Sequence, residues 1–301
     1  MRLNLKMWLA TVSLAVSFIA NSQTITVKHP LGATTLETQP ERVVVLGMDT
    51  LDVLDYLNIK PVGVVKSPIP NYLTQYQDPQ YTDVGTLHEP NFEAIFSLKP
   101  DLIVVSNRSS PSYQELRKIA PTVVFMPDSQ RFWQTTAEGW RMFGQIFEAQ
   151  TKVEQIIAQT NQQIDTVKTK ALAKQATALM VMTNGGNVTT FGAGSRYHAI
   201  FSEFGFKQLV YNDKNLAHGE LISYEFIAQA NPEYLLVMDR DKAIGRDSGD
   251  AMRGFNNALI EQTRAAINHR ITVLNPQAWY ISAGGMTATQ IMVSDMNRAL
   301  D

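Results

Sequence analysis

Two similar stretches of the sequence decide the fold prediction, NFEAIFSLKPDLIVVSNR at residues 91–108 and SYEFIAQANPEYLLVMDR at residues 223–240. Each predicts a short helix, a proline that ends it, a strand that is apolar throughout, and an arginine at the carboxyl end of that strand. Glutamate, isoleucine, proline and arginine recur at an offset of 132 residues, the difference between positions 108 and 240. Two such units in one chain predict two lobes of similar architecture.

Other segments of the chain repeat this alternation of strand and helix. Apolar strands are predicted at RVVVLG (42–47), PVGVV (61–65) and TALMVMT (177–183), and amphipathic helices at 48–59 and 196–206. Strands that are apolar throughout are typical of parallel sheets covered by helices on both faces. We therefore predict an α/β fold of two Rossmann-like lobes with parallel sheets.

A long helical segment separates the two units. Residues 131–175 contain no proline, carry apolar residues at helical spacing and end in lysines that suit a helix C-terminus. A continuous helix over 149–173 would be roughly 36 Å long, enough to join two lobes rigidly. The predicted organisation is an N-terminal lobe at 23–148, this helix, and a C-terminal lobe at 174–301.

The N-terminus differs from the rest of the chain. Arg2 and Lys6 precede an apolar run, and small residues come before Gln23, which predicts a secretory signal peptide over residues 1–22. The alternative is an uncleaved anchor helix, but the apolar run is short for a membrane span. The chain has no cysteine, so we expect neither disulfides nor a lipoprotein anchor, and we expect a periplasmic location.

Charge and motifs exclude several function classes. A formal net charge of −2 gives no basic field for nucleic acid. The sequence has no Walker A motif, no G-x-S-x-G elbow and no H-E-x-x-H, and GAGSRY (192–197) lacks the third glycine of a dinucleotide fingerprint. The signals for an enzyme are therefore poor.

The arginines of the repeat are candidate ligand-binding residues. Ligand sites in open parallel sheets lie beyond the carboxyl ends of the strands, where Arg108 and Arg240 are predicted. Arg196, which follows a glycine-rich turn before the next helix, can join them. Three arginines in one cleft would bind an anion. Alternatively, each arginine caps a helix or pairs with a neighbouring acid such as Asp239.

His218 and Tyr280 are candidate iron ligands. The phenolate of tyrosine is a hard anionic donor that suits Fe³⁺, and imidazole also binds iron. The alternatives are that His218 is an exposed loop residue and that Tyr280 is an aromatic packing residue. An exported metalloenzyme built on these two side chains is a more distant alternative, because no third ligand stands at a suitable spacing.

Glu93 and Glu225 are the acids of the repeat, predicted in the first turns of their helices. An acid at this position can simply stabilise the helix dipole. Since the duplication puts one acid on each lobe, the pair also provides two points for docking on a partner.

Several of these segments together resemble the periplasmic substrate-binding proteins of ATP-driven iron–siderophore importers, and more narrowly the branch that binds enterobactin-like catecholates. The resemblance covers essentially the whole chain after the signal peptide. It is carried by the predicted interlobe helix and by ERVVVLG (41–47), GTLHEPNFEAIFSLKPDLIVVSNR (85–108), FGAGSRYH (191–198), AHG (217–219) and WYISAGGMT (279–287). The segment after Arg108, SSPSYQ (109–114), departs from some relatives because it has no lysine.

The resemblance assigns a role to each candidate residue. It implies that three arginines surround the catecholate oxygens, that a histidine and a tyrosine ligate iron directly when the siderophore is tetradentate, and that two glutamates dock on arginines of the membrane permease. At matching positions these are Arg108, Arg196 and Arg240, then His218 and Tyr280, then Glu93 and Glu225.

The resemblance also implies the wider function. It implies the helical-backbone (class III) periplasmic binding fold, an Fe(III)-catecholate siderophore as ligand with no intrinsic cofactor, and an inner-membrane ABC permease with its ATPase as partners. We expect a monomer. Haem, a hydroxamate siderophore or cobalamin on the same fold remains the nearest alternative.

Overall fold

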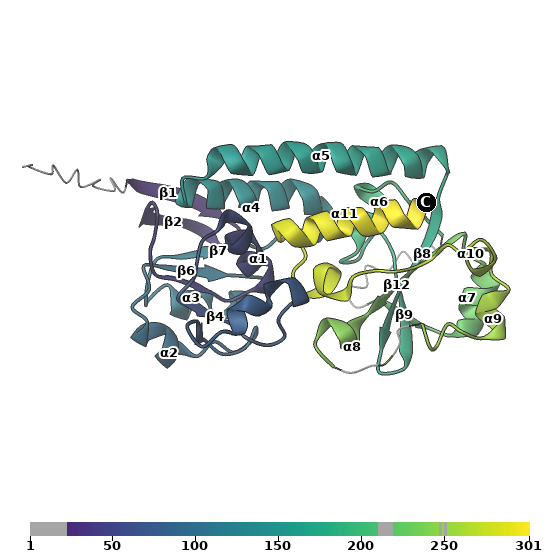
Figure 1. Ribbon diagram of the computed structural model, residues 1–301, viewed down its shortest axis with the longest axis horizontal. Helices are drawn as coiled ribbons and strands as arrows, with labels where there is room; N and C mark the ends of the chain where they lie inside the picture. The colour runs from purple at the N-terminus through teal and green to yellow at the C-terminus, as the bar shows by residue number, and fades with distance from the viewer. Residues whose placement is uncertain (1–22, 210–218, 247–248, 250–251) are drawn as a thin grey trace, which may run out of the picture.

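The computed structural model describes residues 23–209, 219–246, 249 and 252–301. The predicted signal peptide and His218 lie outside these residues. Figure 1 shows two α/β lobes side by side with one long helix, α5 (Gln150–Ala173), running above both. The predicted fold class is therefore confirmed, and the helix begins one residue later than expected.

The N-terminal lobe is built on a five-stranded parallel sheet in the order β5-β4-β3-β6-β7. Every residue of the central strands β3 and β6 is buried, as the unbroken apolar runs predict. A separate antiparallel hairpin, β1–β2, precedes the sheet. The elements are β1 (Thr24–His29), β2 (Gly32–Glu37), β3 (Val43–Val45), α1 (Met48–Leu57), β4 (Gly63–Val64), β5 (Thr82–Asp83), α2 (Phe92–Ser97), β6 (Leu102–Val105), α3 (Tyr113–Leu116), β7 (Thr122–Val124) and α4 (Phe132–Ile146), with 3₁₀ turns at Asn71–Gln77, Ser110–Ser112 and Ser129–Arg131.

The C-terminal lobe has a sheet in the order β11-β9-β8-β12-β13, with β10 also pairing with β8. Its elements are β8 (Thr177–Asn184), β9 (Asn187–Phe191), α6 (His198–Ser202), β10 (Lys207–Gln208), β11 (Glu220–Ile222), α7 (Tyr224–Ala230), β12 (Tyr234–Asp239), α8 (Arg240–Ala243), α9 (Ala258–Glu261), α10 (Arg264–Ile267), β13 (Ile271–Val273) and α11 (Met286–Leu300), with a π-helical turn at Gln277–Ile281.

This second sheet is mixed, whereas parallel sheets were predicted for both lobes. Strands β8, β10, β12 and β13 run parallel, but β9 is antiparallel to β8 and β11 is antiparallel to β9. The physical reason is the turn between β8 and β9, where Gly185 and Gly186 both have positive φ. Such a turn folds the chain directly back into a hairpin. The Gly-Gly turn signal was present in the sequence at Gly185 and Gly186.

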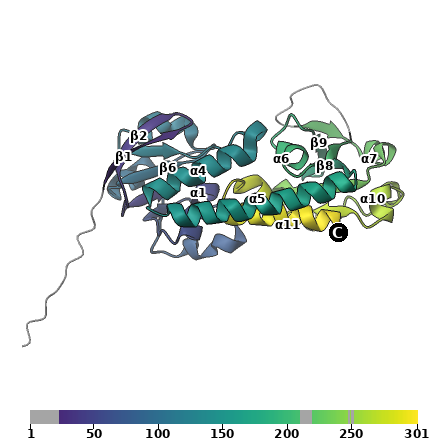
Figure 2. The same cartoon turned by 90° about the horizontal axis from the view of Figure 1, so that it is seen from above.

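Helix α11, the last helix of the chain, packs against both lobes. It lies alongside α5 (Figures 1 and 2) and also packs against α1 of the N-terminal lobe. The buried face of α5 carries apolar residues such as Val153, Ile157 and Ile164 at helical spacing. Within the described part of the chain, no helix combines the length and apolar character needed to cross a membrane.

Candidate functional site

Arg108 and Arg240 both lie just beyond the carboxyl ends of buried strands, as the repeat predicts. Arg108 follows β6 after a short turn in which the Ser109 hydroxyl donates to the carbonyl of Leu46. Arg240 is the first residue of α8, directly after β12. The preceding Asp239 accepts a hydrogen bond from the amide of Lys242, so this acid caps α8. The two arginines thus emerge from equivalent sheet edges.

Tyr280 brings the three predicted arginines together. The guanidinium groups of Arg108 and Arg196 donate to its carbonyl oxygen over 2.8 and 3.2 Å. The Nε of Arg240 donates to its phenol oxygen over 2.9 Å. The three guanidinium carbons lie between 4.3 and 5.7 Å from the centre of the tyrosine ring. Arg240 also donates to the side-chain oxygen of Asn184 over 3.1 Å.

The backbone around Tyr280 explains why its carbonyl is available to two arginines. The residue lies in the π-helical turn Gln277–Ile281, where the amide of Ser282 donates to the carbonyl of Gln277. A turn this short ends before residues beyond it can supply amides to its last carbonyls. Trp279 is buried, and its indole nitrogen donates to Asp295 over 3.0 Å, which anchors the turn from the other side.

A cavity of about 1090 Å³ surrounds this cluster and is lined by residues of both lobes. Its charged end contains Arg108, Arg196, Arg240 and Tyr280, and the buried Asp49 also lines the cavity. This volume slightly exceeds the usual range of about 300–1,000 Å³ for small-molecule sites. The arrangement suits a large, planar anion that contacts several guanidinium groups at once.

The electrostatics of the site favour anions. Burial alone would raise the pKa of Tyr280, but the hydrogen bond from Arg240 and the charges of the three arginines outweigh it and lower that pKa. Burial, together with the charge of Arg196, lowers the pKa of Arg108. Asp49 is buried, and this burial raises its pKa to about 6 despite hydrogen bonds from Thr50 and Ser106 and the charge of Arg108. The cluster therefore combines three neighbouring positive charges with a phenol whose pKa is lowered.

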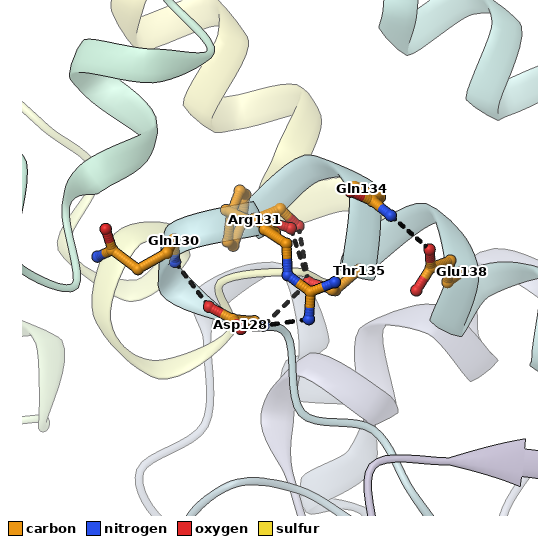
Figure 3. Close-up of polar contacts among 7 residues, drawn as sticks. Asp128, Gln130, Arg131, Gln134, Thr135 and Glu138 are labelled. Atoms are coloured by element: carbon orange, nitrogen blue, oxygen red, sulfur yellow. Dashed lines mark hydrogen bonds and ion pairs between the residues drawn. The ribbon is translucent and has the colours of Figure 1, made fainter.

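A polar rim of the cavity was not predicted from the sequence. Figure 3 shows it at the start of α4, where Asp128 accepts from the Gln130 amide over 2.8 Å and pairs with Arg131 over 3.4 Å. The hydroxyl of Thr135 accepts from the Asp128 amide over 2.9 Å. Of these, Asp128, Arg131 and Thr135 line the cavity. The signal was the aspartate of PDSQRF (127–132), a typical N-cap before a helix.

The two glutamates of the repeat lie outside the cavity. Glu93 is in the first turn of α2 and Glu225 in the first turn of α7, and both are exposed. Each helix start is fixed by a side chain, since Asn91 accepts from the Ala94 amide and Ser223 from the Phe226 amide. The repeat therefore places one acid on each lobe. Among the described residues, no cluster of three or more His, Asp or Glu side chains could hold a metal ion.

Three known proteins resemble this chain over most of their own length. The chain is 35 % identical over 281 residues to the petrobactin-binding protein YclQ of Bacillus subtilis, covering 92 % of this chain and 88 % of the relative. It is 34 % identical to the ferric-anguibactin-binding protein FatB of Vibrio anguillarum, covering 90 % and 86 %. The crystal structure of the periplasmic catecholate-siderophore binding protein VctP from Vibrio cholerae matches with a TM-score of 0.89 and 42 % identity, covering 92 % of this chain and all of that one.

The sequence profile of the periplasmic binding protein family matches residues 43–278, which include most of both lobes and the helix that joins them. Together with the bilobal fold and the interlobe cavity, this match identifies the chain as a member of the periplasmic binding protein family.

Proposed function

We propose that this protein captures ferric catecholate siderophores, including enterobactin-like and linear tetradentate forms, and delivers them to an inner-membrane ABC importer. The observation that carries the proposal is the convergence of Arg108, Arg196 and Arg240 on one ring in a large cavity. A ferric tris-catecholate carries about three negative charges, which three guanidinium groups can balance. Arginine also stacks on flat aromatic faces, so it suits catechol better than lysine would.

The contacts of Tyr280 support the recognition of aromatic oxygen anions. Its carbonyl and phenol oxygens accept hydrogen bonds from the same three arginines that would hold the ligand. A catecholate oxygen is a stronger acceptor than either, because it is charged. The name of one relative agrees with this ligand class, since VctP binds a catecholate siderophore, while YclQ and FatB bind petrobactin and ferric anguibactin.

Tyr280 is also proposed as a direct iron ligand when the siderophore is tetradentate. Such a ligand leaves coordination positions open on octahedral iron, and phenolate oxygen is a suitable donor. The lowered pKa of the Tyr280 phenol favours the form that binds metal. The partner histidine predicted from the sequence, His218, lies outside the described residues, so its role stays a prediction.

A titration of tryptophan fluorescence tests the ligand class. Trp279 lines the cavity, so a bound ferric complex should quench its emission. We expect a ferric catecholate to bind at least about tenfold more tightly than a ferric hydroxamate or haem, a difference of about 1.4 kcal/mol. A gallium catecholate serves as a control of equal charge that does not quench through iron. Equal or tighter binding of the hydroxamate or of haem would reject the catecholate assignment.

Glu93 and Glu225 are proposed as the residues that dock on arginines of the permease. Both are exposed at rigidly capped helix starts, one on each lobe, and the neighbouring Phe96 exposes 69 % of its surface on α2. An exposed acid beside an exposed aromatic residue is suited to a protein interface.

Replacing Glu93 and Glu225 together by alanine should strongly reduce importer activity while leaving siderophore affinity unchanged, because neither side chain lines the cavity. The measurement is uptake by permease and ATPase reconstituted in proteoliposomes, alongside a binding titration. Glu115 and Glu261 are also exposed, one on each lobe, and their double alanine variant is the matched control. Full uptake by the Glu93/Glu225 variant would exclude the docking role.

A further inference from the structure

Asp52, a fully buried acid of α1 in the N-terminal lobe, caps a helix that lies 235 residues further along the chain. One of its carboxylate oxygens accepts from the amide of Thr287 over 2.7 Å, and the other accepts from the amide of Ala288 over 2.8 Å. Both amides belong to the first turn of α11, whose own N-cap position is Gly285 and offers no side chain. Asp52 therefore supplies from another element the acceptor that an N-cap residue normally provides.

The junction between Asp52 and α11 is closely packed. A β-carbon on Gly285 would lie 2.4 Å from a carboxylate oxygen of Asp52, so only glycine fits there without a shift. Burial raises the pKa of Asp52 to about 7, although the amides of Ala288 and Thr287 and the Tyr72 hydroxyl favour the charged form. Burying a carboxyl group costs free energy unless hydrogen bonds replace its lost hydration, and the two helix amides provide such bonds.

The same N-terminal lobe holds the turn that carries Tyr280. The hydroxyl of Tyr72 donates to Asp52 over 3.2 Å and lies 2.6 Å from the hydroxyl of Ser282, two residues after Tyr280. The indole of Trp140 donates to the carbonyl of Gly284 over 2.7 Å. Contacts to this lobe thus occur on the C-terminal side of the turn, although the turn follows β13 of the other lobe.

Tyr280 therefore lies between two sets of restraints. Its backbone carbonyl is bound by Arg108 of the N-terminal lobe and Arg196 of the C-terminal lobe, and its phenol is bound by Arg240 of the C-terminal lobe. The Tyr280 turn leads into α11, whose first turn begins six residues after Tyr280. Asp52 is the acid that fixes it.

We propose that Asp52 is a positioning residue for ligand binding, which holds the Tyr280 turn in register with the arginine cluster from across the lobe interface. Asp52 does not line the cavity, and it acts through α11 and, by way of Tyr72, through Ser282. The part of the inference that concerns iron rests on the proposed function, whereas the positioning of the phenol does not.

The test measures the pKa of the Tyr280 phenol in the ligand-free protein by NMR of ¹³Cζ-labelled tyrosine, with Tyr280→Phe to assign the signal. We expect Asp52→Ala to raise this pKa measurably toward the ordinary value of about 10, because the phenol then moves away from Arg240. Asp52→Asn keeps an acceptor oxygen for one helix amide and should restore part of the shift. Ser282→Ala removes the link to Tyr72, together with the bond of this hydroxyl to the Gln277 carbonyl within the turn, and should give a smaller rise in a stably folded protein.

Ile227→Ala is the matched control for lost stability. Ile227 is fully buried in a separate apolar cluster of the C-terminal lobe, so its replacement should leave the Tyr280 pKa unchanged. Hydrogen exchange at the amides of Thr287 and Ala288 should accelerate in Asp52→Ala and not in Ile227→Ala. An unchanged Tyr280 pKa in Asp52→Ala and Ser282→Ala would overturn the positioning role, and so would an equal rise in the control.

Binding then separates this inference from the proposed function. We expect Asp52→Ala to bind a tetradentate ferric catecholate about tenfold more weakly, with a smaller loss for a hexadentate one. If the unaltered protein binds no catecholate while the pKa of its Tyr280 still depends on Asp52, the proposed ligand is wrong and the positioning role stands. Equal losses for the two ligands would contradict a role that acts through the phenol.

Discussion

Replacing Arg108 and Arg240 together by alanine will weaken the binding of a ferric catecholate by about 3–6 kcal/mol, or roughly 10²- to 10⁴-fold. Both arginines are half-buried at the charged end of the cavity, where their hydrogen bonds to a charged oxygen are partly shielded from water. The loss is measured by fluorescence titration of the double variant against the unaltered protein.

Controls separate ligand contact from damage to the fold. Arg246 lies close in sequence to Arg240, its side chain is 70 % exposed and it does not line the cavity, so Arg246→Ala should bind normally. The double lysine variant at positions 108 and 240 keeps the charge but loses the planar guanidinium group. Its affinity should lie between those of the double alanine variant and the unaltered protein. An affinity within a factor of about two of the unaltered protein would remove these arginines from the ligand site.

Replacing Tyr280 by phenylalanine will weaken the binding of a tetradentate ferric catecholate by about 1.4 kcal/mol or more, at least tenfold, and affect a hexadentate one much less. The reason is that a hexadentate ligand fills all coordination positions of iron, whereas a tetradentate ligand leaves positions that the phenolate can occupy. Parallel titrations measure the affinities, and visible absorption reports the ferric phenolate.

Tyr197→Phe is the matched control for this experiment. Tyr197 is a fully buried neighbour whose ring lies tilted against Trp279 at a centroid distance of 6.4 Å, and it does not line the cavity. Its replacement removes a phenol oxygen from the same region without removing the proposed ligand. If Tyr280→Phe reduces the affinity for the two siderophores equally, its phenol acts only as an acceptor for Arg240 and not as an iron ligand.

Local patterns were sufficient to predict the frame of the protein. Continuous apolar runs predicted the central strands, such as β3 and β6, and uninterrupted helical periodicity predicted α5 to within one residue at its start. The internal repeat predicted that Arg108 and Arg240 leave equivalent strand ends. These features depend on short-range spacing, and a parallel sheet brings all strand ends of one direction to the same edge.

The sheet of the second lobe differs from the prediction. Fully apolar strands suggested a purely parallel sheet, but the glycine turn between β8 and β9 reverses the chain direction. Apolar runs report burial and carry no information about strand direction, so a local turn can change the sheet without changing the pattern. The polar rim at Asp128 was not predicted, because an N-cap residue has the same sequence pattern whether or not it borders a cavity.

The sequence by itself determined the two-lobed α/β frame, the joining helix, and the arginines that follow equivalent strand ends. Only the tertiary structure decided that Arg108, Arg196 and Arg240 meet on Tyr280, and that Asp52 caps α11 across the lobe interface. The physical reason is that hydrogen bonds between residues up to 236 positions apart leave no periodicity in the chain. They form only after packing has placed the elements side by side.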